Sequence, residues 1–298
     1  MKHLALSIAV LLASAEVARA DDPRLWEAGL GLVGVSVPDY GGSDQRQQRV
    51  LPFPYFVYRG KRVQADRDGI HFFGTRRVEF DFSFDAAPPV SSTDNAARDD
   101  MPDLLPSVEV GPSVNLVLLT DEGKTRALKL RLAGRASVAS NVARWEWLGF
   151  TAAPELSFQA VELTWTLKAS VGPLFSTDGV NDYAYEVPDS LATMDRAAYD
   201  ARAGFGGVRA IVRGGWRTGP VWLGVFARYD NLSGASYEDS PLIRSAHAFA
   251  FGTAVAWVFA RSKRRVAASC PETVKRTTVR RAVAGESSSA ETRSRVRI

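Results

Sequence analysis

Few side chains in this sequence could carry out chemistry. After the N-terminal segment there are two histidines, His71 and His247, and the only cysteine is Cys270. A histidine can activate a nucleophile, and two carboxylates can act together as acid and base in hydrolysis. The carboxylates whose positions raise this question are Glu79, Asp81, Glu109 and Glu155.

The sequence motifs that would support such chemistry are missing. Neither histidine is accompanied by a G-x-S-x-G elbow or another nucleophile signature. No cysteines and histidines have the spacing of metal ligands, and the loop PDYGGSDQ (38–45) lacks the spaced carboxylates of a calcium loop. The glycines of GFGGVR (204–209) lie inside a predicted strand, so they do not form a phosphate-binding turn. We therefore predict no catalytic, cofactor-binding or metal site, and no enzyme.

The four carboxylates instead lie in segments where polar and apolar residues alternate. Successive side chains of a strand point to opposite faces, so such a segment has one apolar and one polar face. Between residues 77 and 85 the apolar places are taken by Val78, Phe80, Phe82 and Phe84. The same period occurs in residues 107–118, 126–137, 147–159 and 161–171. The spacing i, i+3, i+4, i+7 of an amphipathic helix is absent from them, so all are predicted strands.

The polar faces of these strands mix acidic and basic residues. An apolar face could cover the core of a soluble sandwich or contact lipid. Carboxylates in strict alternation with aromatic residues fit lipid outside and water inside, as in a membrane barrel. Basic residues share the predicted interior with the carboxylates, and we expect the two kinds to neutralise one another there. They are Arg77, Lys129, Arg131, Arg135 and Lys168.

The N-terminus predicts export. Residues 1–20 contain Lys2, an apolar run from Leu4 to Ala15, and Ala18-Arg19-Ala20, which is the order of a cleaved secretory signal peptide. The apolar run is well short of the roughly 20 residues that span a bilayer as a helix. No later run is long enough, and the mean hydropathy is −0.11, so any membrane insertion must use strands. A single cysteine excludes a disulfide framework.

The C-terminal segment, residues 260–298, is basic. Residues 261–298 hold 11 Lys and Arg against 3 Asp and Glu, a net charge of +8, which leaves −4 for residues 1–260 out of the total of +4. The segment has no aromatic residues and no sustained period, and we predict it to be disordered. A solvated extension without a role and a contact with anionic lipid or another polyanion are both open; nucleic acid is not an expected partner.

Connector lengths predict the topology of the barrel, residues 21–259. Long connectors at 38–49, 88–104, 176–197 and 231–245 are expected on the outer side and short turns on the periplasmic side. Two connectors lie on the same side only if an even number of strands separates them. The first two long connectors therefore require a short hairpin, 61–66 with 69–73, between the strands at 50–59 and 77–86. The result is an all-β antiparallel transmembrane barrel of twelve strands, or of ten if this hairpin folds outside the wall. The later periplasmic turns are predicted at Asp121-Glu122-Gly123, Ala160-Val161 and Gly214-Gly215.

Aromatic residues support this arrangement. Five tryptophans fall near predicted strand ends, where an interfacial girdle is expected: Trp26, Trp145, Trp147, Trp216 and Trp257. Trp165 is predicted in the middle of a strand, facing lipid. The last strand, 247–259, alternates large residues with alanine and glycine and ends on Phe259, as closing strands of outer-membrane barrels do.

Several ordered blocks resemble the MltA-interacting protein family, also called MipA/OmpV. They are Tyr40-Gly41-Gly42-Ser43-Asp44, LPFPYFVYRG (51–60), MPDLLPSVEVGP (101–112), SVGPLF (170–175), YDARAGFGG (199–207), and YDNLSGA (229–235) with DSPL (239–242). The resemblance implies a Gram-negative outer-membrane barrel. It further implies a scaffold that brings a lytic transglycosylase together with a murein synthase, that is, partners that remodel peptidoglycan.

Three other roles remain open. Members of the family are also described as adhesins or as porins linked to envelope stress. A channel should have an open interior, whereas a scaffold should have an interior closed by charged side chains and a working surface on the periplasmic turns. His247 is expected near the outer end of the last strand on the lipid side, where outer-membrane lipid esterases place a histidine, but an interfacial residue without catalysis explains it more simply.

Overall fold

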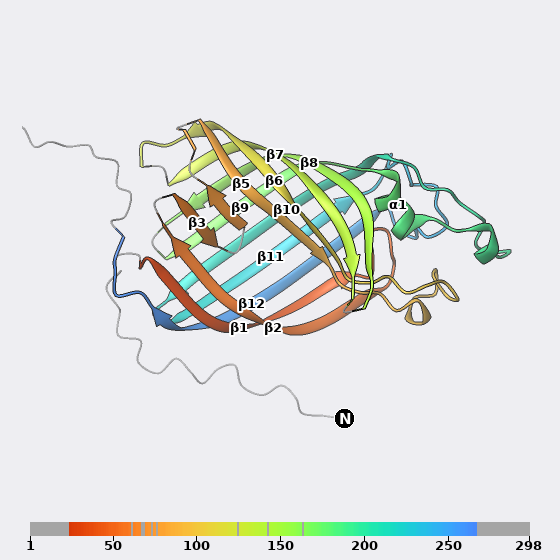
Figure 1. Ribbon diagram of the computed structural model, residues 1–298, viewed down its shortest axis with the longest axis horizontal. Helices are drawn as coiled ribbons and strands as arrows, with labels where there is room; N and C mark the ends of the chain where they lie inside the picture. Colours follow the sequence, from red (N-terminus) through yellow and green to blue (C-terminus); the bar gives the residue numbers. More distant parts are fainter. Residues whose placement is uncertain are drawn as a thin grey trace, which may run out of the picture. The chain divides into compact units, whose positions relative to one another are not determined.

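The computed structural model describes residues 24–266, except residues 61, 67, 68, 73, 76, 124, 142 and 163. The predicted signal peptide, most of the predicted basic tail and Cys270 lie outside the described residues. Twelve strands in antiparallel order form a closed barrel (Figure 1). The predicted fold class is therefore confirmed. The alternative of ten strands is wrong, because the short hairpin pairs with both of its neighbours inside the wall.

The element bounds follow the chain. The strands are β1 (Trp26–Pro38), β2 (Arg46–Arg59), β3 (Val63–Asp66), β4 (Gly69–Phe72), β5 (Val78–Ala87), β6 (Ser107–Thr120), β7 (Arg126–Ser140), β8 (Trp145–Val161), β9 (Trp165–Ser176), β10 (Gly204–Thr218), β11 (Val221–Asn231) and β12 (His247–Arg261). The helices are the 3₁₀ turns η1 (Ser92–Asp94) and η2 (Asp189–Leu191) and the helix α1 (Asp178–Tyr185). No helix among the described residues is long and apolar enough to cross a membrane.

The connectors divide the barrel into two ends. Residues 39–45, 88–106, 177–203 and 232–246 lie at one end, the loop end, together with the short connector 141–144. The opposite turn end holds short connections, and β12 closes against β1 there: the Leu25 N–H donates to the Arg264 carbonyl at 3.0 Å. Long loops face outward and short turns face the periplasm in outer-membrane barrels, so both ends of the described chain lie on the periplasmic side.

Side-chain exposure follows the predicted alternation. On β5, Phe80 and Phe84 are 52% and 62% exposed, whereas Ser83 is 1% exposed. On the closing strand β12, Phe251 and Trp257 are on the outside, and Gly252 and Ala256 between them are buried. The large apolar side chains thus form an outer belt for lipid, and the polar ones face the bore.

Two predicted turns are in the wrong place. The strand β8 continues through Val161, because Arg126 pairs with Ala160, so the turn is at residues 162–164 rather than at Ala160-Val161. The strand β10 continues through Gly214-Gly215 to Thr218. The turn follows at Gly219-Pro220, where Gly219 has a φ of +55°, a conformation that suits glycine.

The shifted turn changes the position of Trp165. This residue begins β9 and pairs with Trp216 near the end of β10, so it lies at the turn end rather than in the middle of a strand. Its prediction as a mid-strand residue was wrong. Trp165 therefore joins Trp26 and Trp216 near the turn end, while Trp145 and Trp147 begin β8 at the loop end. The positions of these tryptophans match the two interfaces of a bilayer.

One glycine in the wall provides a test of strand packing. A Cβ atom on Gly172 of β9 would meet the Pro154 carbonyl oxygen and would lie 2.7 Å from the Glu155 Cα on β8. We expect Gly172→Val to destabilise the barrel by about 1–3 kcal/mol, because backbone atoms cannot move aside easily. Heat-dependent mobility on SDS gels reports the folded fraction. Gly134→Val is the control, since a Cβ there has nothing within 4 Å; equal loss in both variants would contradict the packing argument.

Candidate functional site

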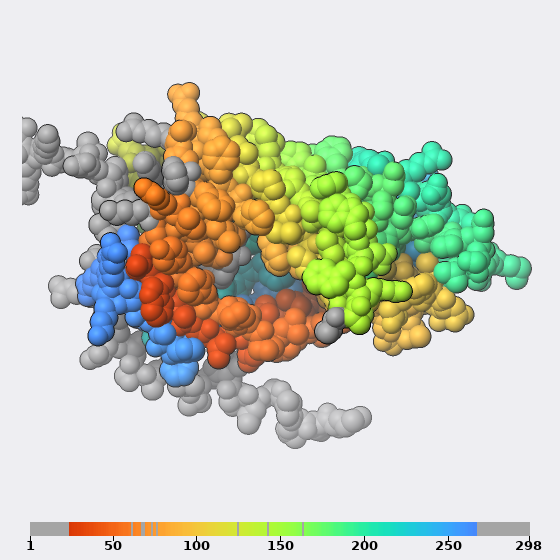
Figure 2. Space-filling view, in the orientation of Figure 1, coloured from red at the N-terminus to blue at the C-terminus, as the bar shows by residue number. Residues whose placement is uncertain are grey.

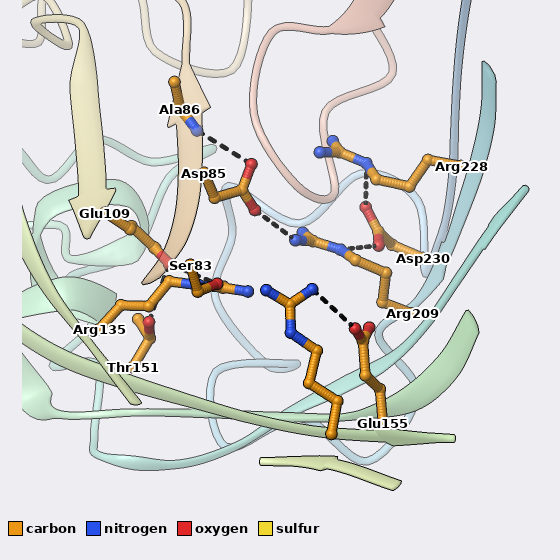
Figure 3. A network of polar contacts seen from close by, with 11 residues as sticks. Ser83, Asp85, Ala86, Glu109, Arg135, Thr151, Glu155, Arg209, Arg228 and Asp230 are labelled. Atoms are coloured by element: carbon orange, nitrogen blue, oxygen red, sulfur yellow. Dashed lines mark hydrogen bonds and ion pairs between the residues drawn. The ribbon is translucent and has the colours of Figure 1, made fainter. Parts of the chain in front are cut away.

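A network of ion pairs crosses the bore of the barrel. Arg209 on β10 holds Asp230 with Nε at 2.6 Å from Oδ1, and it reaches Asp85 on β5 with Nη1 at 3.0 Å from Oδ2 (Figure 3). Arg228 contacts the other oxygen of Asp230 at 3.1 Å. The strands β5 and β10 are separated by four strands in the wall, so the Arg209–Asp85 pair spans the interior. We call these four residues the bore network.

A second group of charges lines the neighbouring wall. Arg135 Nε donates to Ser83 Oγ at 2.7 Å, and its Nη1 lies 3.4 Å from Glu109 Oε2, which also accepts from the Thr151 hydroxyl (Figure 3). Arg131 lies 3.3 Å from Glu155. These contacts confirm that acidic and basic residues on the polar faces neutralise one another.

The other two candidate carboxylates, Glu79 and Asp81, also have polar partners. Lys129 Nζ lies 2.6 Å from Glu79 Oε2. Asp81 accepts from Asn115 and lies 3.0 Å from His71 Nδ1. Each of the four candidate carboxylates is therefore engaged with a cation, a histidine or an amide, and the network does not present a pair of carboxylates to substrate. Arg77 lies just before β5 and is not part of the network.

A further crossing closes the turn end. Glu27 on β1 accepts from Arg217 on β10, with Nη1 at 2.9 Å from Oε2, and from Arg59 at 3.4 Å. The strands β11 and β12 separate β1 from β10 in the wall. Arg217 also donates to the Tyr55 hydroxyl at 3.2 Å, beside an apolar cluster in the bore that includes Trp222.

The four long connectors pack together at the loop end. We call residues 39–45, 88–106, 177–203 and 232–246 the loop cap. Each contributes to one buried apolar cluster, whose centre includes Leu242 and Val187, 0% and 1% exposed. The rings of Tyr185 and Tyr237 stack with centroids 3.9 Å apart, and the Tyr40 hydroxyl donates to the Leu242 carbonyl at 2.9 Å. The loop cap thus has its own hydrophobic core.

Buried polar side chains fix the loops within the cap. Asn95 donates to Asp39 at 2.7 Å and to Ser43 at 3.1 Å, which joins two connectors. Arg196 donates to the carbonyls of Ala97 and Asp99, at 3.2 and 2.7 Å. Buried side chains of this kind specify one arrangement, because an unpaired polar group would be costly.

The two histidines have structural partners. His71 Nε2 lies 3.1 Å from Asp66 Oδ1 in the short hairpin. His247 Nδ1 lies 2.8 Å from the Tyr229 hydroxyl, and the two rings are nearly parallel. The nearby Ser245 hydroxyl donates to the His247 carbonyl rather than to its ring. His247 begins β12 on the exposed face, as predicted, and its ring is held by a phenol.

Metal binding finds no support among the described residues, where no group of three His, Cys, Asp or Glu side chains could hold an ion. The largest part of the bore network, on β10 and β11, is not among the residues predicted from the sequence. Its signal was present: Arg209, Arg213 and Arg217 are spaced by four residues and therefore share one face of a strand. The glycines between them obscured the alternation. The loop cap had no comparable signal, since irregular connectors have no period.

The bore network makes a prediction about stability. Arg209→Met would leave Asp85 without its cation and Asp230 with only Arg228, and Asp230 is buried. Breaking such a pair costs about 3–5 kcal/mol. Urea unfolding of the protein in liposomes, followed by tryptophan fluorescence, measures the change.

Arg213→Met is the matched control for Arg209→Met. It lies on the same strand and face, and no ion pair to it occurs among the described residues. Adding Asp230→Asn to Arg209→Met should recover part of the loss. Equal destabilisation by the two single substitutions would show that the ion pairs do not hold the bore.

The tyrosines of the loop cap predict an alkaline transition. Burial raises the pKa of Tyr40 and of Tyr183 to about 12, and the pKa of Tyr185 well above its ordinary value of about 10. Folding favours the neutral phenol, so this stabilisation is complete below about pH 10 and is lost as the pH rises toward about 12. Absorbance at 295 nm should show delayed ionisation, with protease sensitivity of the loops appearing in the same range. A single titration of all tyrosines near pH 10 would contradict the prediction that the tyrosines of the loop cap ionise late.

Several solved structures and one family model are similar to this chain. A search of curated proteins found no match. Similar solved structures include an outer membrane channel from Pseudomonas putida F1, with 13% identity, coverage of 80% of this chain and 96% of that one, and a TM-score of 0.44. OprB of P. putida has 11% identity, coverage of 70% of this chain and 49% of that one, and a TM-score of 0.33. The P. putida toluene transporter TodX has 10% identity, coverage of 82% and 91%, and a TM-score of 0.32. The family model described as MltA-interacting protein MipA matches residues 30–259. This chain therefore belongs to the MipA family of outer-membrane β-barrels.

Proposed function

We propose that this barrel is a non-conducting scaffold of the outer membrane that binds peptidoglycan-remodelling enzymes, a lytic transglycosylase and a murein synthase. The observation that carries the proposal is the double closure of the bore. The Arg209–Asp85 pair joins opposite walls, and the loop cap has its own core over the outer mouth. A solute could cross the barrel only if both closures opened.

The turn end is the surface that we assign to the partners. It faces the periplasm, where peptidoglycan lies, and its turns carry exposed acidic residues such as Glu122 and Glu162. The predicted signal peptide, with cleavage after Ala20, delivers the chain to this location. The predicted basic tail follows β12 from the same end, and we propose that it contacts anionic lipid or another polyanion of the envelope.

A channel is the second candidate, because one cavity remains within the bore. It has a volume of about 80 Å³ and is lined by Arg131, Arg135, Arg209 and Arg213 among others. Asp85 and Glu155 line the same cavity, and the excess of guanidinium groups over carboxylates would favour anions over cations. A conducting form of the barrel should therefore be anion-selective.

Conductance in planar bilayers separates the two candidates. We expect no resolved current steps from the purified wild-type barrel. The variant that combines Asp85→Ala and Arg209→Ala with Leu242→Asp in the core of the loop cap should give steps, because it removes both closures, and this also verifies that the protein inserts. Resolved anion-selective steps from the wild type would overturn the non-conducting scaffold.

Affinity capture from envelope extracts in mild detergent tests the partners. Wild-type barrel should recover a lytic transglycosylase and a murein synthase. Reversing charge at the turn end, with Glu122→Lys and Glu162→Lys, should reduce recovery several-fold. The matched control Asp195→Lys reverses an exposed charge in the loop cap and should not. Failure to recover either enzyme would contradict the scaffold proposal.

A further inference from the structure

The barrel wall is incompletely paired between β2 and β5. Only Tyr58 and Arg59 of β2 pair with β3, and only Ile70, His71 and Phe72 of β4 pair with β5. Toward the loop end, residues 46–57 of β2 pair only with β1, and residues 83–87 of β5 pair only with β6, among the described residues. We call the gap between these two segments the window. The short hairpin β3–β4 closes only its periplasmic part (Figure 1).

The space-filling view supports an opening at this place. A hollow lies between the orange and yellow surfaces, and atoms of the far wall, coloured teal, are visible at its base (Figure 2). Leu51 of β2 belongs to the inward-facing set, yet it is 47% exposed. Its exposure shows that neighbouring side chains leave the inner face of β2 uncovered beside the window.

Two prolines explain why no strand fills the window. Arg59 donates its N–H toward β1, to Leu25 at 2.7 Å, and residues of a strand alternate in the direction of their N–H groups. The even-numbered residues of β2 therefore direct their backbone groups to the window. Pro52 and Pro54 are even-numbered and lack an N–H, so this edge is poor in donors and unsuited to a further strand.

On the opposite edge of the window, an aspartate side chain of β5 occupies a backbone donor. Pro112 of β6 lies opposite Phe82 and has no N–H to donate across the β5–β6 ladder, so the even-numbered residues of β5 direct their backbone groups away from β6. Ala86 therefore directs its N–H to the window. The Asp85 carboxylate accepts this N–H at 2.9 Å (Figure 3). The window is consequently bordered by an excess of carbonyl acceptors, which bare hydrocarbon cannot satisfy. An occupant must bring hydroxyl or amide donors.

The outer flanks of the window are apolar. Val50 and Phe84 stand on either side of it and are 72% and 62% exposed. From Val50 to Phe56 the free edge is roughly 20 Å long at ~3.3 Å per residue, which is comparable to an extended acyl chain. An occupant therefore needs apolar chains as well as hydrogen-bond donors.

Arginines border the loop end of the window. A cavity of about 340 Å³ lies there, lined in part by Arg46 and Arg49. Arg49 donates to the Pro89 carbonyl at 3.3 Å and to Gln47 at 2.7 Å. Arg46 instead directs its guanidinium across β1, away from the window, and donates to the Ser36 carbonyl at 3.1 Å and to the Phe249 carbonyl of β12 at 2.6 Å. All of these acceptors are neutral.

The acidic residues of the same cavity do not form ion pairs with these arginines. Asp39 accepts from Asn95, and Asp94 also lines the cavity. Within the described part of the chain, neither Arg46 nor Arg49 has a carboxylate at ion-pair distance. The guanidinium of Arg49, which has neutral partners beside the window, is complementary to phosphate.

We propose that the window binds a phosphorylated glycolipid of the outer leaflet. Its acyl chains would lie against Val50, Leu51 and Phe84, its hydroxyl and amide groups would donate to the free carbonyls of β2, and its phosphate would contact Arg49. A strand from a partner protein is disfavoured, because the two prolines remove donors that a ladder requires. This inference does not depend on the scaffold function, and its test does not involve the enzymes.

Photo-crosslinking from within the wall tests the proposal. A photoreactive phenylalanine analogue replaces Leu51 in barrels reconstituted in vesicles of phosphatidylethanolamine containing lipid A, and mass spectrometry identifies the adducts. We expect lipid A adducts enriched at least fivefold over its share of the vesicle lipid. The control at Ala254, which faces inward from a closed wall, should give no lipid adduct, and Val255 on the outer face should report the bulk composition.

Two outcomes would overturn the proposal: no lipid adduct at Leu51, or adducts in the bulk ratio. The variant Arg49→Gln should abolish the enrichment. Arg46→Gln on the opposite edge of β2 and Arg126→Gln at the turn end should not. Equal enrichment for lipid A and its dephosphorylated form would refute the contact between the phosphate and Arg49. Heat-dependent gel mobility verifies that each variant is folded, and Ala87, which borders the window from β5, provides a second crosslinking position.

Discussion

The need to satisfy backbone hydrogen bonds without water governs this structure. In the hydrocarbon layer each N–H and C=O must find a partner within the protein, and a sheet does so only by closing on itself. The pairing of β1 with β12 meets this requirement at the ends of the chain. Alternation then follows: the outward residues must be apolar, and the inward residues are free to be charged. The charges of the bore are permitted by closure and would not be tolerated on the other face.

Charges inside a narrow barrel carry their own constraint. A guanidinium removed from bulk water needs a carboxylate or several acceptors, and in the bore these come from strands far apart in sequence. Arg209 meets Asp85 across 124 positions of the chain, and Arg217 meets Glu27 across 190. The same contacts that satisfy the charges also brace opposite walls. This is why a barrel of intermediate size can be closed without a separate plug domain.

The loop cap and the window show how the two ends of the wall differ. At the outer mouth four connectors bury Leu242 and Tyr185 in a small core of their own, so the loops act as one unit. Below the cap, the short hairpin leaves part of β2 and β5 unpaired, and Pro52 and Pro54 keep that edge from recruiting a strand. The barrel is therefore closed along its axis and accessible from the side. A scaffold with its partners at the turn end and a lipid in its wall fits this geometry.

Much of this could be predicted from the sequence, since alternation is a local property. The twelve strands, the apolar outside, the neutralised interior of β5 to β8 and the side on which the long connectors lie all follow from a period of two and from connector length. The turns after β8 and β10 were misplaced, because glycines such as Gly214 occur within strands as well as between them. Local sequence determined which residues face lipid. Tertiary structure alone decided which charges meet across the bore, how the connectors share a core, and that the wall stays open between β2 and β5, because these depend on contacts between segments whose positions are fixed only when the barrel closes.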